Sequence, residues 1–209
     1  MSPSAIHLHQ GDLPASVSFG PSVAIDTETM GLTPRRDKLC LVQLSAGDGT
    51  CHMVKFDIQK PYHAPHLLRL LKDSSVTKIF HFARFDLAVL AYTFGIMPTS
   101  IYCTKIASKL ARTHTPHHSL KNLCHDLLDQ TLNKQQQSSD WSQPVLSEEQ
   151  LAYAAHDVLY LHSLKRILDE ALIRTNRQAL AEACFSFLPT CAQLDLDGWE
   201  VGSLFSHSS

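Results

Sequence analysis

Short apolar runs bounded by turn-forming residues dominate the first half of the chain. Because these runs are rich in residues that favour β-structure, they predict strands at residues 23–26, 39–45, 51–56, 77–81 and 100–103. The segment GDGT at residues 47–50 predicts a hairpin turn between the second and third strands. The first strands are therefore expected to pair in antiparallel fashion.

Apolar residues that recur every three or four positions predict helices, mostly in the second half, at residues 65–72, 85–94, 104–111, 120–128, 148–171 and 174–185. Ser147, followed three residues later by Gln150, predicts a capping box at the start of the long helix. Residues 133–144 form a polar loop in which Trp141 is expected to be an anchor. Hairpin-linked strands followed by alternating strands and helices indicate an α/β fold, with a mixed sheet and helices on both faces.

Composition narrows the possible functions. The chain has 209 residues, enough for one medium domain, and 18 Lys and Arg against 20 Asp and Glu give a net charge of −2. This balance excludes a protein that grips long duplexes by overall basicity. No apolar run approaches the roughly 20 residues of a membrane helix, and the first residues lack a signal-peptide pattern, so a cytoplasmic protein is expected. The six cysteines contain no C-x-x-C pair and are expected to be reduced, mostly buried thiols rather than zinc ligands.

Three groups of residues are candidates for chemistry. Asp26 and Glu28 alternate at the end of an apolar strand, so their carboxylates are expected to lie side by side, although a polar strand exit would look the same. Asp86 lies in the first turn of a predicted helix, where an acid also suits the helix dipole. Tyr153 and Asp157 are four residues apart and share a helix face, as a buried hydrogen-bonded pair would.

Together these residues resemble the motifs of the DEDD superfamily of 3′–5′ exonucleases, in its tyrosine-bearing branch. AIDTETMGL (24–32), SLKNL (119–123), KQQQSSDW (134–141) and YAAHDVLYL (153–161) are similar to segments of RNase D. The resemblance runs from about residue 5 to residue 190. It implies an RNase H-like mixed five-stranded sheet, an exonuclease domain at residues 1–190, and a C-terminal tail at 191–209 that is partly ordered or used in assembly.

The resemblance also implies a two-metal mechanism. Two Mg²⁺ or Mn²⁺ ions can activate a water and stabilise the leaving oxygen of a phosphodiester, and both ions prefer carboxylate oxygens. Asp26, Glu28, Asp86 and Asp157 match the four metal carboxylates of the family. Tyr153 matches the residue that orients the attacking water or helps to deprotonate it. A phenol with a pKa near 10 is more credible as a positioning group than as a base.

Within the family, TKIFHFARFDLAVLAYTFG (77–95) and LDLDGWE (194–200) look most like nanoRNase C. That branch implies hydrolysis of short oligoribonucleotides, dinucleotides included, to 5′-mononucleotides. It also implies a homo-oligomer, with a ring-like octamer as one form to be tested. Three alternatives stay open: trimming of structured RNA ends such as tRNA precursors, a DNA exonuclease, and a non-catalytic nucleic-acid-binding homologue, against which the complete set of acids argues.

Substrate contacts are expected close to the acids, at Thr27, Met30, Gly31, Leu32, His81, Phe85, Lys134 and Trp141. An apolar residue after Glu28 can stack on a base, and core packing of Leu32 is the alternative. His81 could equally cap the sheet, and the loop with Lys134 and Trp141 could be an exposed structural loop.

The distribution of charged residues along the chain gives a separate prediction. Residues 87–125 contain no Asp or Glu, while they carry Lys105, Lys109, Arg112 and Lys121. Such a stretch is commonly a solvated face, and here it predicts a local positive surface that lines the path to the metals or an oligomer lumen.

Overall fold

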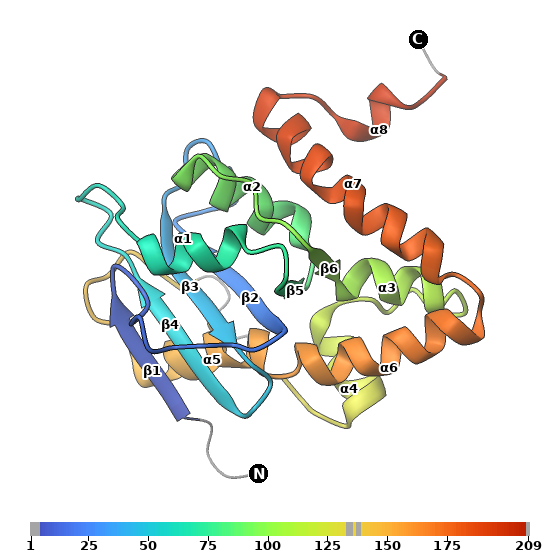
Figure 1. Ribbon diagram of the computed structural model, residues 1–209, viewed down its shortest axis with the longest axis horizontal. Coiled ribbons are helices and arrows are strands. Elements are labelled where there is room, and N and C mark those ends of the chain that lie inside the picture. Colours follow the sequence, from blue (N-terminus) through green and yellow to red (C-terminus); the bar gives the residue numbers. More distant parts are fainter. Residues whose placement is uncertain (1–4, 133–135, 137–138, 208–209) are drawn as a thin grey trace.

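The computed structural model describes residues 5–132, 136 and 139–207, which form a single sheet covered by helices (Figure 1). The sheet has the strand order β1-β4-β3-β2-β5-β6. Its strands are β1 (Ala5–Gln10), β2 (Ser22–Thr29), β3 (Leu39–Ser45), β4 (Thr50–Lys55), β5 (Thr77–Phe80) and β6 (Ile101–Cys103). β2 pairs with β3 and β3 with β4 in antiparallel fashion, whereas the other neighbours are parallel. The mixed sheet is therefore confirmed.

The expected number of strands is wrong, because the sheet formed by the described residues has six strands and not five. The additional strand, β1, forms the edge beside β4, and most of its residues are exposed or half-buried. Its sequence, AIHLHQ, alternates apolar residues with histidines and lacks the continuous apolar run that marks the inner strands. His7 and His9 stack against His52 of β4, so these polar positions of β1 pack on a histidine of the neighbouring strand instead of on the core.

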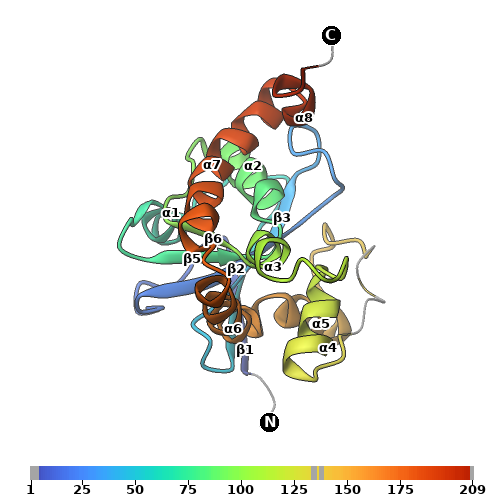
Figure 2. The same ribbon diagram turned by 90° about the vertical axis from the view of Figure 1, so that its right-hand side faces the viewer.

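The helices are α1 (Pro65–Lys72), α2 (Ala83–Phe94), α3 (Thr104–Ala111), α4 (Leu120–Leu128), α5 (Glu148–Leu159), α6 (Leu161–Arg174), α7 (Gln178–Asp197) and α8 (Val201–Leu204). α1 and α2 lie on one face of the sheet and α5 on the other (Figures 1 and 2). The single helix expected at 148–171 is broken at Tyr160, which separates α5 from α6. α7 continues without interruption across residue 190, where a tail was expected to begin, and packs on α2.

The core explains why β2 holds its position. Every residue of β3 is buried, and Val23, Ala24 and Ile25 of β2 are fully buried beside it. Ser147 and Gln150 form the expected capping box, which fixes the start of α5 over this part of the sheet. The cysteines are all free, and five of the six are buried, as expected for reduced thiols. None of the helices in the described part of the chain combines the length and apolar character that a bilayer crossing requires.

Candidate active site

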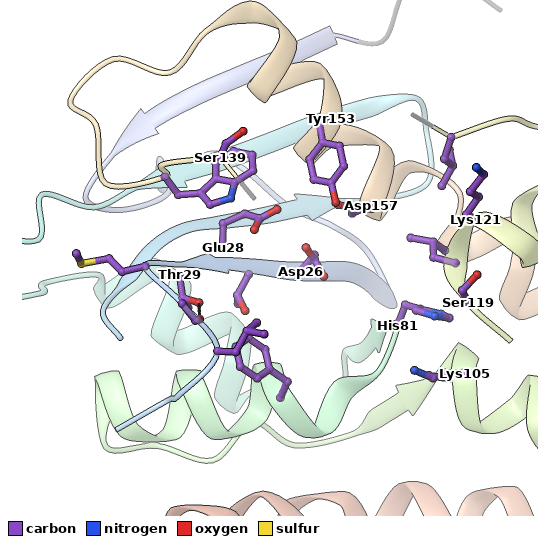
Figure 3. Close-up of a pocket in the computed structure, with 18 residues that line it drawn as sticks. Asp26, Glu28, Thr29, His81, Lys105, Ser119, Lys121, Ser139, Tyr153 and Asp157 are labelled. Atoms are coloured by element: carbon purple, nitrogen blue, oxygen red, sulfur yellow. Dashed lines mark hydrogen bonds between the residues drawn. The ribbon is translucent and has the colours of Figure 1, made fainter. Parts of the chain in front are cut away.

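The side chains of Asp26 and Glu28 leave β2 on the face that α5 covers, where α5 presents Tyr153 and Asp157 (Figure 3). Asp26, Glu28 and Asp157 each offer a carboxylate oxygen, and these oxygens lie within 4.8 Å of one another. The alternation of β2 and the four-residue spacing of α5 thus place each pair of side chains on one face of its element, as the sequence predicted. Two elements far apart in the chain meet to form one acidic cluster.

Asp86 approaches this cluster from the opposite face of the sheet. Thr27 lies between Asp26 and Glu28 and therefore points the other way, toward α2, where its hydroxyl donates a 2.7 Å hydrogen bond to Asp86. Asp86 is buried in the first turn of α2, as predicted. Among the described residues, Asp86 is not part of the three-carboxylate group, and its charge reaches Asp26 and Glu28 from behind β2.

The carboxylates oppose one another's ionisation. Burial raises the pKa of Asp26, and burial together with the charges of Asp26, Asp157 and Asp86 raises the pKa of Glu28 well above its usual range. Burial and the charge of Asp26 likewise raise the pKa of Asp86, although the bond from Thr27 works in the other direction. A group of acids packed this closely is unfavourable unless a cation joins it.

Tyr153 is half-buried above the acids, and its ring lies 6.1 Å from that of Trp141. Burial, followed by the charges of Asp157, Glu28 and Asp26, raises the pKa of the Tyr153 phenol. The phenol is therefore protonated at neutral pH and can donate a hydrogen bond. Trp141 is only 2% exposed, which confirms it as the anchor of its loop.

A cavity of about 740 Å³ opens over the acidic cluster. It brings together nearly all the predicted substrate contacts, namely Thr27, Met30, Gly31, Leu32, His81, Phe85 and Trp141, with Asp26, Glu28, Tyr153 and Asp157. Leu32 is 86% exposed, so core packing of this side chain is excluded. Gly31 fits here because a Cβ would collide with the carboxylate of Asp37. The predicted contact at Lys134 lies outside the described residues.

The cavity has two chemically different ends (Figure 3). His81, Lys105, Ser119 and Lys121 lie at one end, and Thr29 lies at the other, where the exposed side chains of Met30 and Leu32 follow it in the chain. The acids lie between the two ends. One end therefore offers positive charge and hydroxyl groups, and the other offers apolar surface.

Some lining residues were not among the predicted substrate contacts. Lys105 and Lys121 belong to the acid-free stretch, so charge alone indicated them, and Lys105 Nζ lies 4.3 Å from the centre of the Phe82 ring. Thr29, Ser119, Leu120, Leu132 and Ser139 also line the cavity. Ser119 caps α4 by accepting a hydrogen bond from the backbone of Asn122, a role that the motif SLKNL did not reveal.

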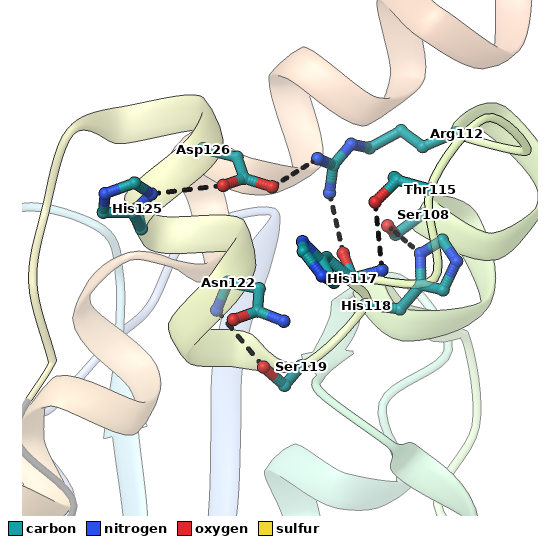
Figure 4. Close-up of polar contacts among 9 residues, drawn as sticks. All are labelled: Ser108, Arg112, Thr115, His117, His118, Ser119, Asn122, His125 and Asp126. Carbon is teal, nitrogen blue, oxygen red and sulfur yellow. Dashed lines mark hydrogen bonds and ion pairs between the residues drawn. The ribbon is translucent and has the colours of Figure 1, made fainter.

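The acid-free stretch is not uniformly a positive surface, because Arg112 is buried and paired (Figure 4). Its guanidinium donates to Asp126 of α4 at 2.6 Å and to the backbone carbonyl of His117 at 3.0 Å. Arg112 thus ties α3 to α4, which corrects the expectation that it contributes to a positive surface along the path to the metals or an oligomer lumen. Lys109 is exposed but does not line the cavity.

The acidic cluster fits a hard divalent cation. Carboxylate oxygens are the ligands that Mg²⁺ and Mn²⁺ prefer, and Mg²⁺ keeps open positions for water and phosphate oxygens. A cation held among Asp26, Glu28 and Asp157 would remove the repulsion that raises the pKa of Glu28. The donor set, the crowded charge and the cavity above it all agree with such an ion.

Comparison with known proteins agrees with this chemistry. Residues 12–173 match the sequence pattern of the family described as 3′-5′ exonuclease. Ribonuclease D from Gluconacetobacter diazotrophicus is 37% identical over 158 residues, which are 75% of this chain and 39% of that protein. The chain thus spans about two-fifths of the length of this relative. It belongs to the 3′–5′ exonuclease family, as an RNase D-like member of the DEDD superfamily.

The likeness to one kind of nuclease extends over nearly the full chain. Brucella melitensis NrnC, solved bound to pGG, is 55% identical, with a TM-score of 0.93 over 98% of this chain and 99% of that one. The same nuclease with bound Mg²⁺ is 54% identical, with a TM-score of 0.92 over 98% of this chain and 100% of that one. These matches confirm the resemblance to nanoRNase C and the RNase H-like fold.

Proposed function

We propose that this protein is a metal-dependent 3′–5′ exoribonuclease that hydrolyses short oligoribonucleotides, dinucleotides included, to 5′-mononucleotides. The observation that carries the proposal is the group formed by Asp26, Glu28 and Asp157, whose oxygens lie within 4.8 Å of one another on the floor of the cavity. The full-length likeness to NrnC, which was solved with pGG and with Mg²⁺, supports the same chemistry.

Each residue of the site has a proposed role. Two divalent ions, Mg²⁺ or Mn²⁺, are held by the carboxylates of Asp26, Glu28, Asp157 and Asp86, of which the first three lie together and Asp86 approaches from behind β2. When bound, such ions activate a water and stabilise the leaving oxygen. Tyr153 stays protonated and orients the attacking water by a hydrogen bond, which agrees with the raised pKa of its phenol.

The two ends of the cavity suit a short single strand. Met30 and Leu32 offer exposed apolar side chains on which a terminal base can stack regardless of its identity. Lys105 and Lys121 at the other end can neutralise a phosphate. A cavity of about 740 Å³ has the size of a small-ligand site, which favours a short substrate over structured RNA.

A length series tests the proposal. The RNAs carry a label at the 5′ end and range from dinucleotides to about twenty nucleotides. The longest of them exceed the length that one single-strand-binding fold covers. They are compared at one Mg²⁺ concentration and one salt concentration, beside matched DNAs and a tRNA precursor. We expect kcat/KM to be highest for the shortest RNAs. A preference for the tRNA precursor would support end trimming, and a preference for DNA would support the DNA exonuclease. Undiminished cleavage in excess chelator would contradict metal dependence.

We also propose that the protein acts as a homo-oligomer in the cytoplasm, with a ring-like octamer as the form to test. The free cysteines suit a reducing compartment. The segment from residue 191 onward exposes Trp199, Leu204 and Phe205, which supports a role of this segment in assembly. Light scattering on the full chain and on Trp199→Ser gives the mass directly, and a monomeric wild-type protein would contradict assembly.

A further inference from the structure

The side-chain amide of Gln43 is a buried polar group in the middle of β3. Gln43 is 0% exposed, and within the described part of the chain neither its amide nitrogen nor its amide oxygen has a hydrogen-bond partner. Burying an amide without a partner is unfavourable, so such a group in a packed interior requires an explanation. A leucine or methionine would fill the same space without this cost.

Gln43 lies directly beside the acidic cluster. β2 and β3 are antiparallel, and the Cα partner of Gln43 is Asp26. Residues directly opposite each other on antiparallel strands project to the same face, with Cβ atoms about 4.5–5.5 Å apart. The carboxylate of Asp26 faces Asp157 of α5, so the amide of Gln43 also lies under α5, next to that carboxylate.

The other neighbour of Gln43 cannot satisfy it. On the far side, Gln43 pairs with Met53 of β4, which is fully buried and offers only a thioether, a weak acceptor. Of these two cross-strand neighbours, Asp26 is therefore the one with a strong acceptor. A carboxylate that holds an ion with one oxygen keeps further acceptor positions, and outer hydrogen bonds to metal ligands fix their orientation.

We propose that Gln43 is a positioning residue whose amide NH₂ donates a hydrogen bond to the carboxylate of Asp26 when that carboxylate holds a divalent ion. The proposal rests on the metal site of the proposed function. It explains why a polar amide, and not an apolar side chain, is buried at this position. Gln43 touches neither substrate nor reacting atoms in this arrangement and acts through Asp26.

The test is Gln43→Met, which preserves length and approximate volume but removes the amide. Mn²⁺ binding is measured by electron paramagnetic resonance on the full chain without substrate, and thermal melting is measured with chelator. We expect the melting temperature to stay equal or rise, because an unpartnered polar group has been removed. We expect Mn²⁺ affinity to fall about 10- to 100-fold, and kcat at saturating Mg²⁺ to fall with it while KM for RNA changes little.

Two further variants make the result decisive. Leu44→Met changes the neighbouring buried residue of β3 that faces the other side of the sheet, and it should leave Mn²⁺ affinity at the wild-type value. Asp26→Asn reports on the metal site itself. If Asp26→Asn loses Mn²⁺ and activity while Gln43→Met keeps both, the role of Gln43 is overturned and the metal site stands. If Asp26→Asn binds Mn²⁺ and cleaves RNA like the wild type, the proposed function has failed as well.

A purely structural role for Gln43 has a different signature. If the amide serves only the fold, for instance through a buried water, Gln43→Met lowers the melting temperature and leaves Mn²⁺ affinity unchanged, which overturns the proposal. Gln43→Asn serves where Gln43→Met does not fold. It keeps an amide but shortens its reach, so the proposal predicts weaker Mn²⁺ binding, and wild-type affinity would contradict it.

Discussion

Asp26 of β2 and Asp157 of α5 place carboxylate oxygens within 4.8 Å of each other with Glu28 beside them. Two acids so close repel each other. The contact therefore makes the ion-free fold less stable than a neutral version of it would be. A group of residues that lowers the stability of the fold in this way is typical of a functional site.

The first prediction follows from that repulsion. Asp157→Asn keeps the shape of the side chain but removes one charge, so we expect hydrolysis to fall about 1,000-fold, equivalent to about 4 kcal/mol of transition-state stabilisation. In chelator, the same variant should melt at a higher temperature than the wild type. Asp126→Asn, which affects the pair with Arg112, is the control and should keep normal turnover. An active Asp157→Asn enzyme would contradict the site.

The second prediction concerns Tyr153. Its phenol has a raised pKa and is protonated at neutral pH, so we expect it to contribute a hydrogen bond that holds the attacking water. Tyr153→Phe should lower kcat about 100-fold, the usual effect of a misplaced reactant, and leave Mn²⁺ affinity unchanged. Since a positioning phenol does not titrate between pH 6 and 9, the pH profile of kcat should keep its shape in the variant. Loss of a limb of that profile in Tyr153→Phe would instead identify Tyr153 as an acid or base.

The third prediction is the pH dependence of stability without metal. The pKa of Asp26 is raised from 3.8 to about 7, so the folded state disfavours the ionised form. Its contribution to stability is therefore present at low pH and is lost as the pH rises from about 4 through about 7. Thermal melting in chelator should show a decline over this range, and Asp26→Asn should make the decline smaller, while Glu28 and Asp86 keep part of it.

The stabilisation of the fold by Mg²⁺ should also depend on pH. An ion that binds the folded state and not the unfolded chain stabilises the fold, and it binds ionised carboxylates. The rise in melting temperature on adding Mg²⁺ should accordingly be larger at pH 8 than at pH 5. An equal rise at both pH values would show that the ion binds elsewhere.

Local sequence patterns predicted the features of the fold that depend only on residues close together in the chain. The alternation of Asp26 and Glu28 follows from strand geometry, and the capping box of Ser147 and Gln150 follows from the chemistry of a helix start. By contrast, β1 was missed because an edge strand buries little and needs no apolar run. The break at Tyr160 was missed because the apolar repeat continues through it from α5 into α6.

The candidate site was predictable in its acids but not in its surroundings. The closeness of Asp157 to Asp26 depends on how α5 packs over β2, and only the family resemblance indicated it. The pairing of Arg112 with Asp126 depends on the path of the chain between α3 and α4, so charge counting placed Arg112 on the surface when it is buried. The unpartnered amide of Gln43 is visible only once β2 and β3 are paired.

The last prediction separates the cations of the acid-free stretch by position. Lys105 lines the cavity and Lys109, one turn later on α3, is exposed outside it. Lys105→Glu should raise KM for short RNA about 10-fold, which corresponds to about 1.4 kcal/mol of binding, and should lower the salt slope of binding by about 1. Lys109→Glu changes the net charge equally, so it tests whether a change in overall charge is enough to weaken RNA binding. Equal effects of the two variants on KM and on the salt slope would mean that long-range attraction, and not contact in the cavity, recognises the phosphate.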